Sequence, residues 1–157
     1  MTPLYFFEAA RTPEQLRKME QLEKDGICVF CPEHFQQNHI HPICIQSDLW
    51  YVTQNDFPYK GASLHLLIVP KRHIRSLSEC TDEEGAALFR VLKFIKKEYK
   101  TASEALVARS GDMRFNGGSV EHLHLHYVVG DISDPDHEPI KFKVSSRPKN
   151  IEPPNRD

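Results

Sequence analysis

The stretch His122-Leu123-His124-Leu125-His126-Tyr127-Val128-Val129 decides the fold and carries the first sign of function. In a β-strand, alternate side chains point to the same face of the sheet. The three histidines therefore share one face, and the apolar residues between them share the other face, towards a core. Burying three imidazoles for packing alone is unfavourable, because each ring has polar nitrogens that need partners. The alternation therefore predicts a strand with one apolar face and one functional face.

Three interpretations of this histidine face are open. The histidines can be solvated side chains on an exposed strand, although the flanking apolar alternation favours an ordered one. The imidazoles of His122, His124 and His126 can hold one metal ion together. Alternatively, one histidine acts as a nucleophile while its neighbours set its tautomer and stabilise charge.

Apolar runs on both sides of this stretch predict further strands. Two short runs flank the polar pair Ser47-Asp48, which is typical of a hairpin turn, and a third, nearly continuous run ends at Pro70. A loop is expected at residues 116–119. We expect strands or short strand pieces at residues 42–46, 49–53, 63–69, 106–109, 113–115, 122–129 and 140–144.

Two helices are indicated by their capping signals. Thr81 and Glu84 fit a capping box, and apolar residues recur at helical spacing as far as Tyr99. A shorter, mostly polar helix is expected from Thr12 to about Lys24, on the surface or against a partner subunit, and residues 27–40 are expected to be irregular. The sequence thus predicts an α+β fold. It is an antiparallel sheet of about five strands, with one long helix packed across it and a shorter N-terminal helix.

Length and composition narrow the class of protein. The 157 residues indicate one domain at residues 1–144, followed by a flexible C-terminal tail at residues 145–157. The chain has 20 Lys+Arg against 22 Asp+Glu, which does not favour binding to extended nucleic acid. No apolar run approaches the roughly 20 residues of a membrane helix. Four cysteines do not form a disulfide scaffold in a chain of this length, so we expect a reducing, cytoplasmic compartment.

Three motifs in order resemble those of the histidine triad (HIT) superfamily. Residues 122–128 match the pattern His-φ-His-φ-His-φ-φ, and residues 65–73 resemble the family's strand that ends in Pro-Lys-x-His. Residues 28–31, Cys-Val-Phe-Cys, resemble the opening of the zinc-bearing bacterial branch. The resemblance implies a HIT-like fold, a homodimer, and a nucleotide hydrolase or nucleotidyl transferase. Such an enzyme cleaves at the α-phosphate of a nucleoside 5′-phosphoryl compound, of the phosphoramidate or dinucleoside polyphosphate type.

The resemblance also implies roles for three catalytic residues. His124, the middle histidine, attacks the α-phosphorus and forms a covalent nucleotidyl-histidine. An imidazole suits this role, because its unperturbed pKa of ~6.5 leaves it neutral near pH 7. His126 donates to a non-bridging phosphate oxygen, and the hydroxyl of Ser119 passes a proton near the leaving group.

Four further residues are implied to bind the substrate. Asn55 corresponds to a residue that contacts the ribose, and Asn116 is a candidate for orienting phosphate. Many family members have Gln where Gly118 stands here. The backbone amides of Gly117 and Gly118 can take its place, because glycine lets a backbone approach phosphate closely. This departure also leaves open a nucleotide-binding or regulatory module with little turnover.

The zinc-bearing branch implies a structural zinc ion held by Cys28, Cys31, His73 and His122. The ion would tie the N-terminal segment to the ends of two strands. From the residues alone, Cys-x₂-Cys also fits a redox motif, but no thioredoxin-like βαβ pattern follows it.

Other histidines and cysteines have less defined expectations. His34 and His39 lie close to the cysteine pair and compete with the distant histidines as ligands. Cys44 lies in an apolar run and is expected to be a core residue, and Cys80 to be a free thiol. His65 is either a satisfied core histidine or a residue near the active site.

Overall fold

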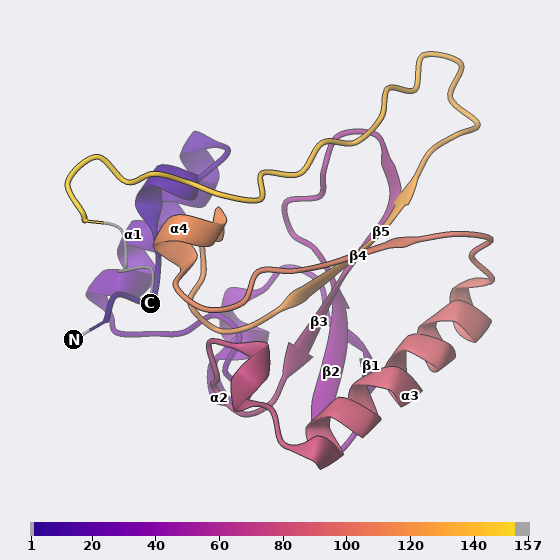
Figure 1. Cartoon of the computed structure of the whole chain (residues 1–157), viewed down its shortest axis with the longest axis horizontal. Coiled ribbons are helices and arrows are strands. Elements are labelled where there is room, and N and C mark those ends of the chain that lie inside the picture. Colours follow the sequence, from indigo (N-terminus) through magenta and orange to yellow (C-terminus); the bar gives the residue numbers. More distant parts are fainter. Residues whose placement is uncertain (1, 153–157) are drawn as a thin grey trace.

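The computed structural model describes residues 2–152 and confirms the α+β fold, with an antiparallel sheet between two layers of helices (Figure 1). The strands, in the sheet order β1-β2-β3-β5-β4, are β1 (Ile43–Gln46), β2 (Trp50–Gln54), β3 (Ala62–Pro70), β5 (Leu125–Gly130) and β4 (Ala105–Ala108). The helices are α1 (Pro13–Lys24), α2 (Pro32–Asn38), α3 (Asp82–Tyr99) and α4 (Met113–Asn116), with 3₁₀ turns η1 (Phe7–Ala9) and η2 (Leu77–Glu79).

The long helix α3 covers one face of the sheet. Its predicted capping box is present: Thr81 Oγ1 accepts from the Glu84 amide at 3.1 Å, and Glu84 Oε2 accepts from the Thr81 amide at 2.8 Å. Its apolar stripe packs on β2, β3 and β5. We call this packed layer the α3-side core; its buried residues are Trp50, Val52, Leu66, Ile68, Ile74, Ala87, Leu88, Val91, Ile95, Leu123, Leu125 and Tyr127.

Shorter elements, α1, α2 and the N-terminal segment, cover the opposite face. Thr12 caps α1 as predicted, accepting from the Gln15 amide at 3.1 Å. The helix does not lie only on the surface, however, because its own side chains Met19 and Leu22 are buried against the rest of the protein. We call this layer the α1-side cluster; its buried residues are Tyr5, Met19, Leu22, Cys28, Val29, Phe30, Cys31, Phe35, Tyr51, Leu67 and Val69.

Two short helices correct the sequence predictions. Residues 27–40 are not wholly irregular, because α2 forms with Pro32 in its first turn and buries Phe35 in the α1-side cluster. Residues 113–115 are helical rather than extended. There, Asp112 Oδ1 accepts from the Arg114 amide at 3.0 Å, and Gly117 ends the helix in the left-handed region with φ of 79°.

Two strand predictions also differ from the structure. β5 begins at Leu125 rather than at His122, because the preceding backbone bonds elsewhere: the Leu123 amide donates to the Ile74 carbonyl at 2.7 Å. Residues 140–144 form no strand, and the Lys143 carbonyl accepts from the Arg109 side chain instead of a neighbouring strand.

The C-terminal segment runs from β5 past one end of the sheet towards α4 and α1 (orange to yellow in Figure 1). Within it, the Ser146 amide donates to the Phe115 carbonyl at 2.8 Å. Residues 153–157 of the predicted flexible tail lie outside the described residues, and the flexibility of the tail stays a prediction. None of the helices in residues 2–152 combines the length and the apolar character that a membrane span requires.

Candidate functional site

The histidine stretch sends its side chains to both faces of the sheet, as the alternation predicts. Leu123, Leu125 and Tyr127 lie in the α3-side core. His122, His124 and His126 are all buried, and Phe30 of the α1-side cluster contacts the first two of these rings. The three histidines do not surround one point, because each has a different set of partners. This arrangement does not favour a metal ion shared by the three imidazoles.

His122 belongs to a group of four side chains that can hold a metal ion. Donor atoms of Cys28, Cys31, His73 and His122 all lie within 4.8 Å of one another. His122 Nδ1 is 3.5 Å from Cys28 Sγ and 3.7 Å from Cys31 Sγ, and His73 Nδ1 is 3.2 Å from Cys31 Sγ. Tetrahedral zinc places sulfur and nitrogen ligands about 3.6 Å apart. The spacing and the S₂N₂ donor set therefore fit zinc.

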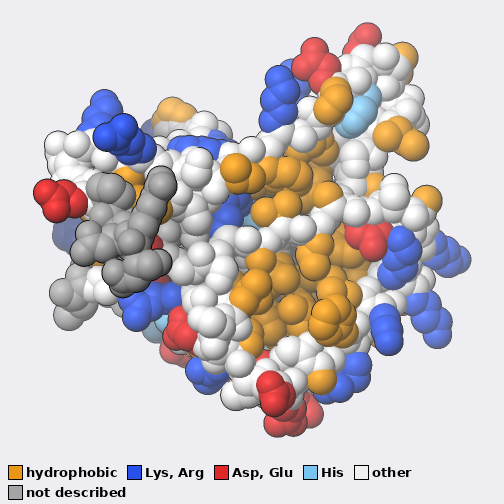
Figure 2. All heavy atoms as spheres, viewed as in Figure 1, with side chains coloured by type: hydrophobic (Ala, Val, Ile, Leu, Met, Phe, Trp, Pro, Cys, Tyr) orange, Lys and Arg blue, Asp and Glu red, His pale blue; other side chains and the backbone are white. Residues whose placement is uncertain are grey.

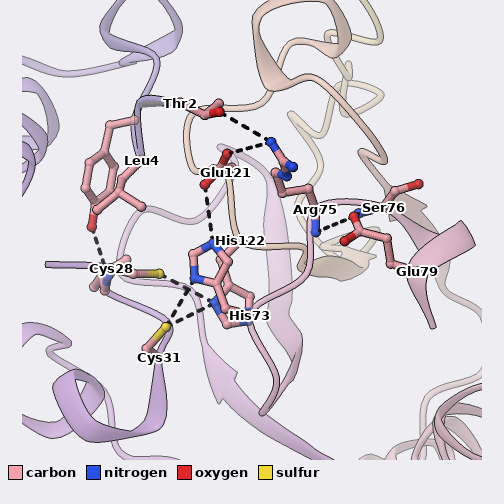
Figure 3. Close-up of polar contacts among 12 residues, drawn as sticks. Thr2, Leu4, Cys28, Cys31, His73, Arg75, Ser76, Glu79, Glu121 and His122 are labelled. Carbon is pink, nitrogen blue, oxygen red and sulfur yellow. Dashed lines mark hydrogen bonds and ion pairs between the residues drawn. The ribbon is translucent and has the colours of Figure 1, made fainter. Parts of the chain in front are cut away.

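The other ring nitrogens of this group have partners that fix the two histidines, and Figure 3 shows the partner of His73, Glu121. His122 Nε2 lies 2.9 Å from the Pro70 carbonyl, and His73 Nε2 lies 3.3 Å from a carboxylate oxygen of Glu121. Arg75 contacts the second oxygen of Glu121. These contacts direct both Nδ1 atoms towards the thiols, as is usual around metal-binding histidines. Sequence reasoning missed Glu121, because only the fold shows that it reaches His73.

The two competing histidines are not part of this group. His39 Nδ1 lies 2.9 Å from an Asp56 oxygen, and His34 lies on α2 outside the four-residue group. Of the remaining cysteines, Cys44 is exposed rather than in the core, and Cys80 is a free thiol of intermediate exposure.

A cavity lies beside His124 and His126, on the α1 side of the sheet. One part of its wall is apolar and comes mainly from the α1-side cluster: Tyr5, Met19, Leu22, Val29, Phe30, Leu67 and Val120. The other part is polar and has more basic than acidic side chains: Arg11, Lys18, Asn55, Asp56, Arg109, Ser119, His124, His126, Lys141 and Lys143, with Asp56 paired to Lys18. Such a cavity suits a ligand with an apolar ring at one end and negative charge at the other.

The His124 ring is held by a backbone carbonyl two residues earlier in the chain. Its Nδ1 donates to the His122 carbonyl at 2.8 Å, so the hydrogen is on Nδ1 and the lone pair is on Nε2. Burial lowers the pKa of His124 to about 4, which keeps the ring neutral at neutral pH. A neutral, oriented imidazole in a cavity wall is a nucleophile or a hydrogen-bond acceptor.

His126 is connected to His65 and Arg109. His126 Nδ1 lies 2.9 Å from His65 Nε2, and His126 Nε2 lies 3.1 Å from Arg109 Nη1. Asn55 also contacts this cluster through Nδ2, because its Oδ1 accepts from the Phe57 amide at 2.9 Å. Burial lowers the pKa of His65 to about 4 and that of His126 well below its usual value. His65 is thus a buried histidine with partners at both ring nitrogens, one of which is His126 of the cavity wall.

The remaining predicted site residues divide into two groups. Asn55, Gly117 and Ser119 line the cavity. Asn116 and Gly118 bond to each other instead, since the Gly118 amide donates to Asn116 Oδ1 at 2.8 Å.

The basic side chains of the cavity were missed by sequence reasoning. They come from separate parts of the chain: Arg11 beside α1, Arg109 at the end of β4, and Lys141 and Lys143 in the C-terminal segment. No local pattern connects these residues. The fold brings them together, and the C-terminal segment contributes Lys141 and Lys143.

Known proteins resemble this chain in sequence and structure. A family model described as HIT domain matches residues 36–132. A nitrilase and fragile histidine triad fusion protein of Caenorhabditis elegans is 32% identical over 95 residues, 56% of this chain; the match spans only 20% of that protein. An uncharacterized HIT-like protein of Chlamydia muridarum is 26% identical over 90 residues, 55% of this chain and 69% of that protein.

Solved structures share the fold. A HIT family hydrolase from Clostridium thermocellum aligns with a TM-score of 0.53 at 25% identity, over 71% of this chain and 94% of that chain. A hypothetical histidine triad nucleotide-binding protein from Sulfolobus tokodaii aligns with a TM-score of 0.55 at 22% identity, over 76% of this chain and 81% of that chain.

Proposed function

This chain belongs to the HIT domain family, and from this premise we propose that it hydrolyses or transfers nucleotides through a covalent nucleotidyl-His124 intermediate. The substrate class is a nucleoside 5′-phosphoryl compound, a phosphoramidate or a dinucleoside polyphosphate. One observation carries the proposal: the 2.8 Å bond from His124 Nδ1 to the His122 carbonyl, which leaves the Nε2 lone pair for attack. The HIT family hydrolase from Clostridium thermocellum supports the reaction class.

The proposed reaction has two displacements at the α-phosphorus. In the first, the Nε2 lone pair of His124 forms a bond to phosphorus while the bond to the leaving group breaks. The leaving group takes a proton from solvent, which the Ser119 hydroxyl relays. In the second, water or another acceptor forms the new bond to phosphorus, loses a proton, and releases neutral His124. His126 Nε2–H donates to a non-bridging oxygen as charge develops.

We propose that the cavity binds the nucleoside by its two unlike walls. The base contacts the apolar side chains around Phe30, and Asn55 contacts the ribose. Gly117 lies against the phosphate, whereas the bond between Asn116 and Gly118 holds the shape of this loop.

Release of AMP from adenosine 5′-phosphoramidate and from diadenosine polyphosphates tests the proposal. We expect His124→Ala to lower turnover by at least about 10³-fold, because the nucleophile is removed. The matched control is His34→Ala, which changes a histidine outside the cavity and is expected to retain native rates. Mass spectrometry of the quenched native enzyme should find a nucleotide adduct that is absent from His124→Ala. Native turnover by His124→Ala would refute the mechanism.

A nucleotide-binding or regulatory module with little turnover is the second candidate. It is favoured by Gly118, which stands where many HIT proteins have Gln and whose amide is already bonded to Asn116. Tight binding of a nucleotide by the native protein, with neither adduct nor product after hours, would select this candidate over the enzyme.

We propose that the ion held by Cys28, Cys31, His73 and His122 is zinc. Two thiolates and two imidazoles are a common structural zinc set, and the ion would contribute stability rather than reaction chemistry. It would link the segment before α2 to the residues that follow β3 and precede β5.

We further propose that the protein is a homodimer that uses the β4 edge of the sheet. β4 ends the strand order, and Leu106 on it is exposed, as are Phe89 and Phe94 on α3. Figure 2 shows hydrophobic side chains gathered on the face that carries these elements. Such patches mark association surfaces. Leu106→Glu should shift the native dimer to a monomer in sedimentation; a monomeric native protein would contradict the proposal.

A further inference from the structure

An excess of hydrogen-bond donors surrounds the two histidines at the polar end of the cavity. The Tyr59 amide lies 3.0 Å from His65 Nδ1, and the Asn55 Nδ2 group lies 3.1 Å from His65 Nε2. Arg109 Nη1 lies 3.1 Å from His126 Nε2. His65 Nε2 and His126 Nδ1 are themselves 2.9 Å apart. Three N–H groups from outside therefore point at one pair of imidazoles.

The two rings do not have enough acceptors for these donors. Their lowered pKa values keep both rings neutral at pH 7. Two neutral imidazoles supply two acceptor nitrogens in any combination of tautomers, and the contact between His65 and His126 uses one of them. One acceptor remains for three outside donors. A guanidinium has only N–H donors and does not lose its proton, so Arg109 cannot present an acceptor to His126.

The Tyr59 backbone amide sets the tautomers of both rings and so determines where the surplus N–H donors lie. When the Tyr59 amide donates to His65 Nδ1, the His65 hydrogen is on Nε2 and donates to His126 Nδ1. One surplus donor, Asn55 Nδ2, then lies beside the His65 Nε2–H. The His126 hydrogen is on Nε2 and faces the other surplus donor, Arg109 Nη1. Two donors thus meet at the cavity wall, where an anionic oxygen is the group that satisfies both.

The other two nitrogens of the Arg109 guanidinium, Nε and Nη2, are held by Lys143 and Tyr59. Arg109 Nε and Nη2 lie 3.2 Å and 3.1 Å from the Lys143 carbonyl, and Nη2 lies 3.2 Å from the Tyr59 hydroxyl. These contacts leave Nη1 as the nitrogen directed at His126. A group held in this way binds a ligand without first losing conformational freedom.

We infer that Arg109 Nη1 and His126 Nε2–H together bind one non-bridging oxygen of the phosphate that His124 attacks. Arg109 thereby makes binding depend on the negative charge of the ligand. The inference rests on the proposed function for the identity of the ligand. It adds a cationic substrate contact to the three catalytic residues that the family resemblance implies.

The ratio of AMP affinity to adenosine affinity tests this role, measured by calorimetry and repeated with GMP and guanosine. Arg109→Gln removes the charge but retains a side-chain amide that can donate to the Lys143 carbonyl. We expect AMP affinity to fall about 10- to 100-fold and adenosine affinity to change by less than about 2-fold. The matched control is Arg114→Gln, which removes a charge paired with Asp112 outside the cavity and should behave as the native protein.

Each other outcome is decisive. Equal AMP affinity in the native protein and Arg109→Gln overturns the inference while the proposed function stands. A parallel loss of AMP and adenosine binding also overturns it, because that is the result of losing a structural tether. Binding of no nucleotide or nucleoside by the native protein overturns the proposed function together with the inference. If Arg109→Gln does not fold, Arg109→Lys replaces it and should give a smaller fall in the same ratio.

Discussion

The two faces of the sheet differ in how they are covered, although the stretch around β5 supplies side chains to both. On the α3 side, one long capped helix lies over a continuous apolar core. On the α1 side, several short elements cover buried histidines and cysteines and leave a cavity. The difference shows that buried polar groups are tolerated where each has a partner. His122 has the Pro70 carbonyl, and His124 has the carbonyl of His122.

Loss of the four-residue metal site should have the largest effect on the free energy of unfolding. It should loosen the α1 side of the sheet and leave the α3 side unchanged. Changing both Cys28 and Cys31 to Ala, or treating the native protein with a chelator, is expected to lower the free energy of unfolding by several kcal/mol. Hydrogen exchange should accelerate in α2 and remain slow in α3, because the ion would tie only the α1 side. Elemental analysis should find one zinc per native chain and none in the double variant. Cys44→Ala is the control, and full zinc content in the double variant would contradict the ligand set.

Truncation in the α3-side core should affect stability alone. Ile95 is fully buried on α3, and Ile95→Ala should lower the free energy of unfolding by about 2–5 kcal/mol. Below the melting temperature, nucleotide binding should remain native, because the cavity is on the other face. Lys93→Ala, at an exposed position on the same helix, should change the free energy of unfolding by less than about 0.5 kcal/mol. Weaker nucleotide binding by Ile95→Ala would show that the faces are coupled.

The two faces also differ in how well they could be predicted. The capping box of α3 and the alternation around His124 are local patterns, and both predictions hold. The α2 and α4 helices are too short for a periodic signal, and tertiary burial of Phe35 and Met113 stabilises them. Arg109 and Glu121 were missed because their partners are distant in sequence. Local patterns thus predict elements, whereas long-range contacts decide which side chains meet.

On the α1 side, the buried carboxylate of Asp56 should make the free energy of unfolding depend on pH. Burial raises the pKa of Asp56, but hydrogen bonds from His39 and the Ile40 amide outweigh it and hold that pKa well below 3.8. A lowered pKa contributes stability above the unfolded value, and this stability is lost as the pH falls below about 4. Asp56→Asn should therefore be less stable by about 1–3 kcal/mol at pH 7. It should lose less stability than the native protein between pH 5 and pH 2, by denaturant titration. Identical losses in the two proteins would contradict this origin.

The smallest expected effect comes from a matched pair of helix caps, one on each face. Thr12 caps α1 and Thr81 caps α3, each by accepting from a backbone amide at 3.1 Å. Thr12→Ala and Thr81→Ala should each lower the free energy of unfolding by about 1 kcal/mol. Only Thr12→Ala should also weaken nucleotide binding, because α1 carries Lys18 and Met19 into the cavity wall whereas α3 contributes no residue to it. Calorimetric binding at a temperature where both variants are folded separates the two effects. Equal binding by both would mean that α1 holds its cavity residues in place without its cap.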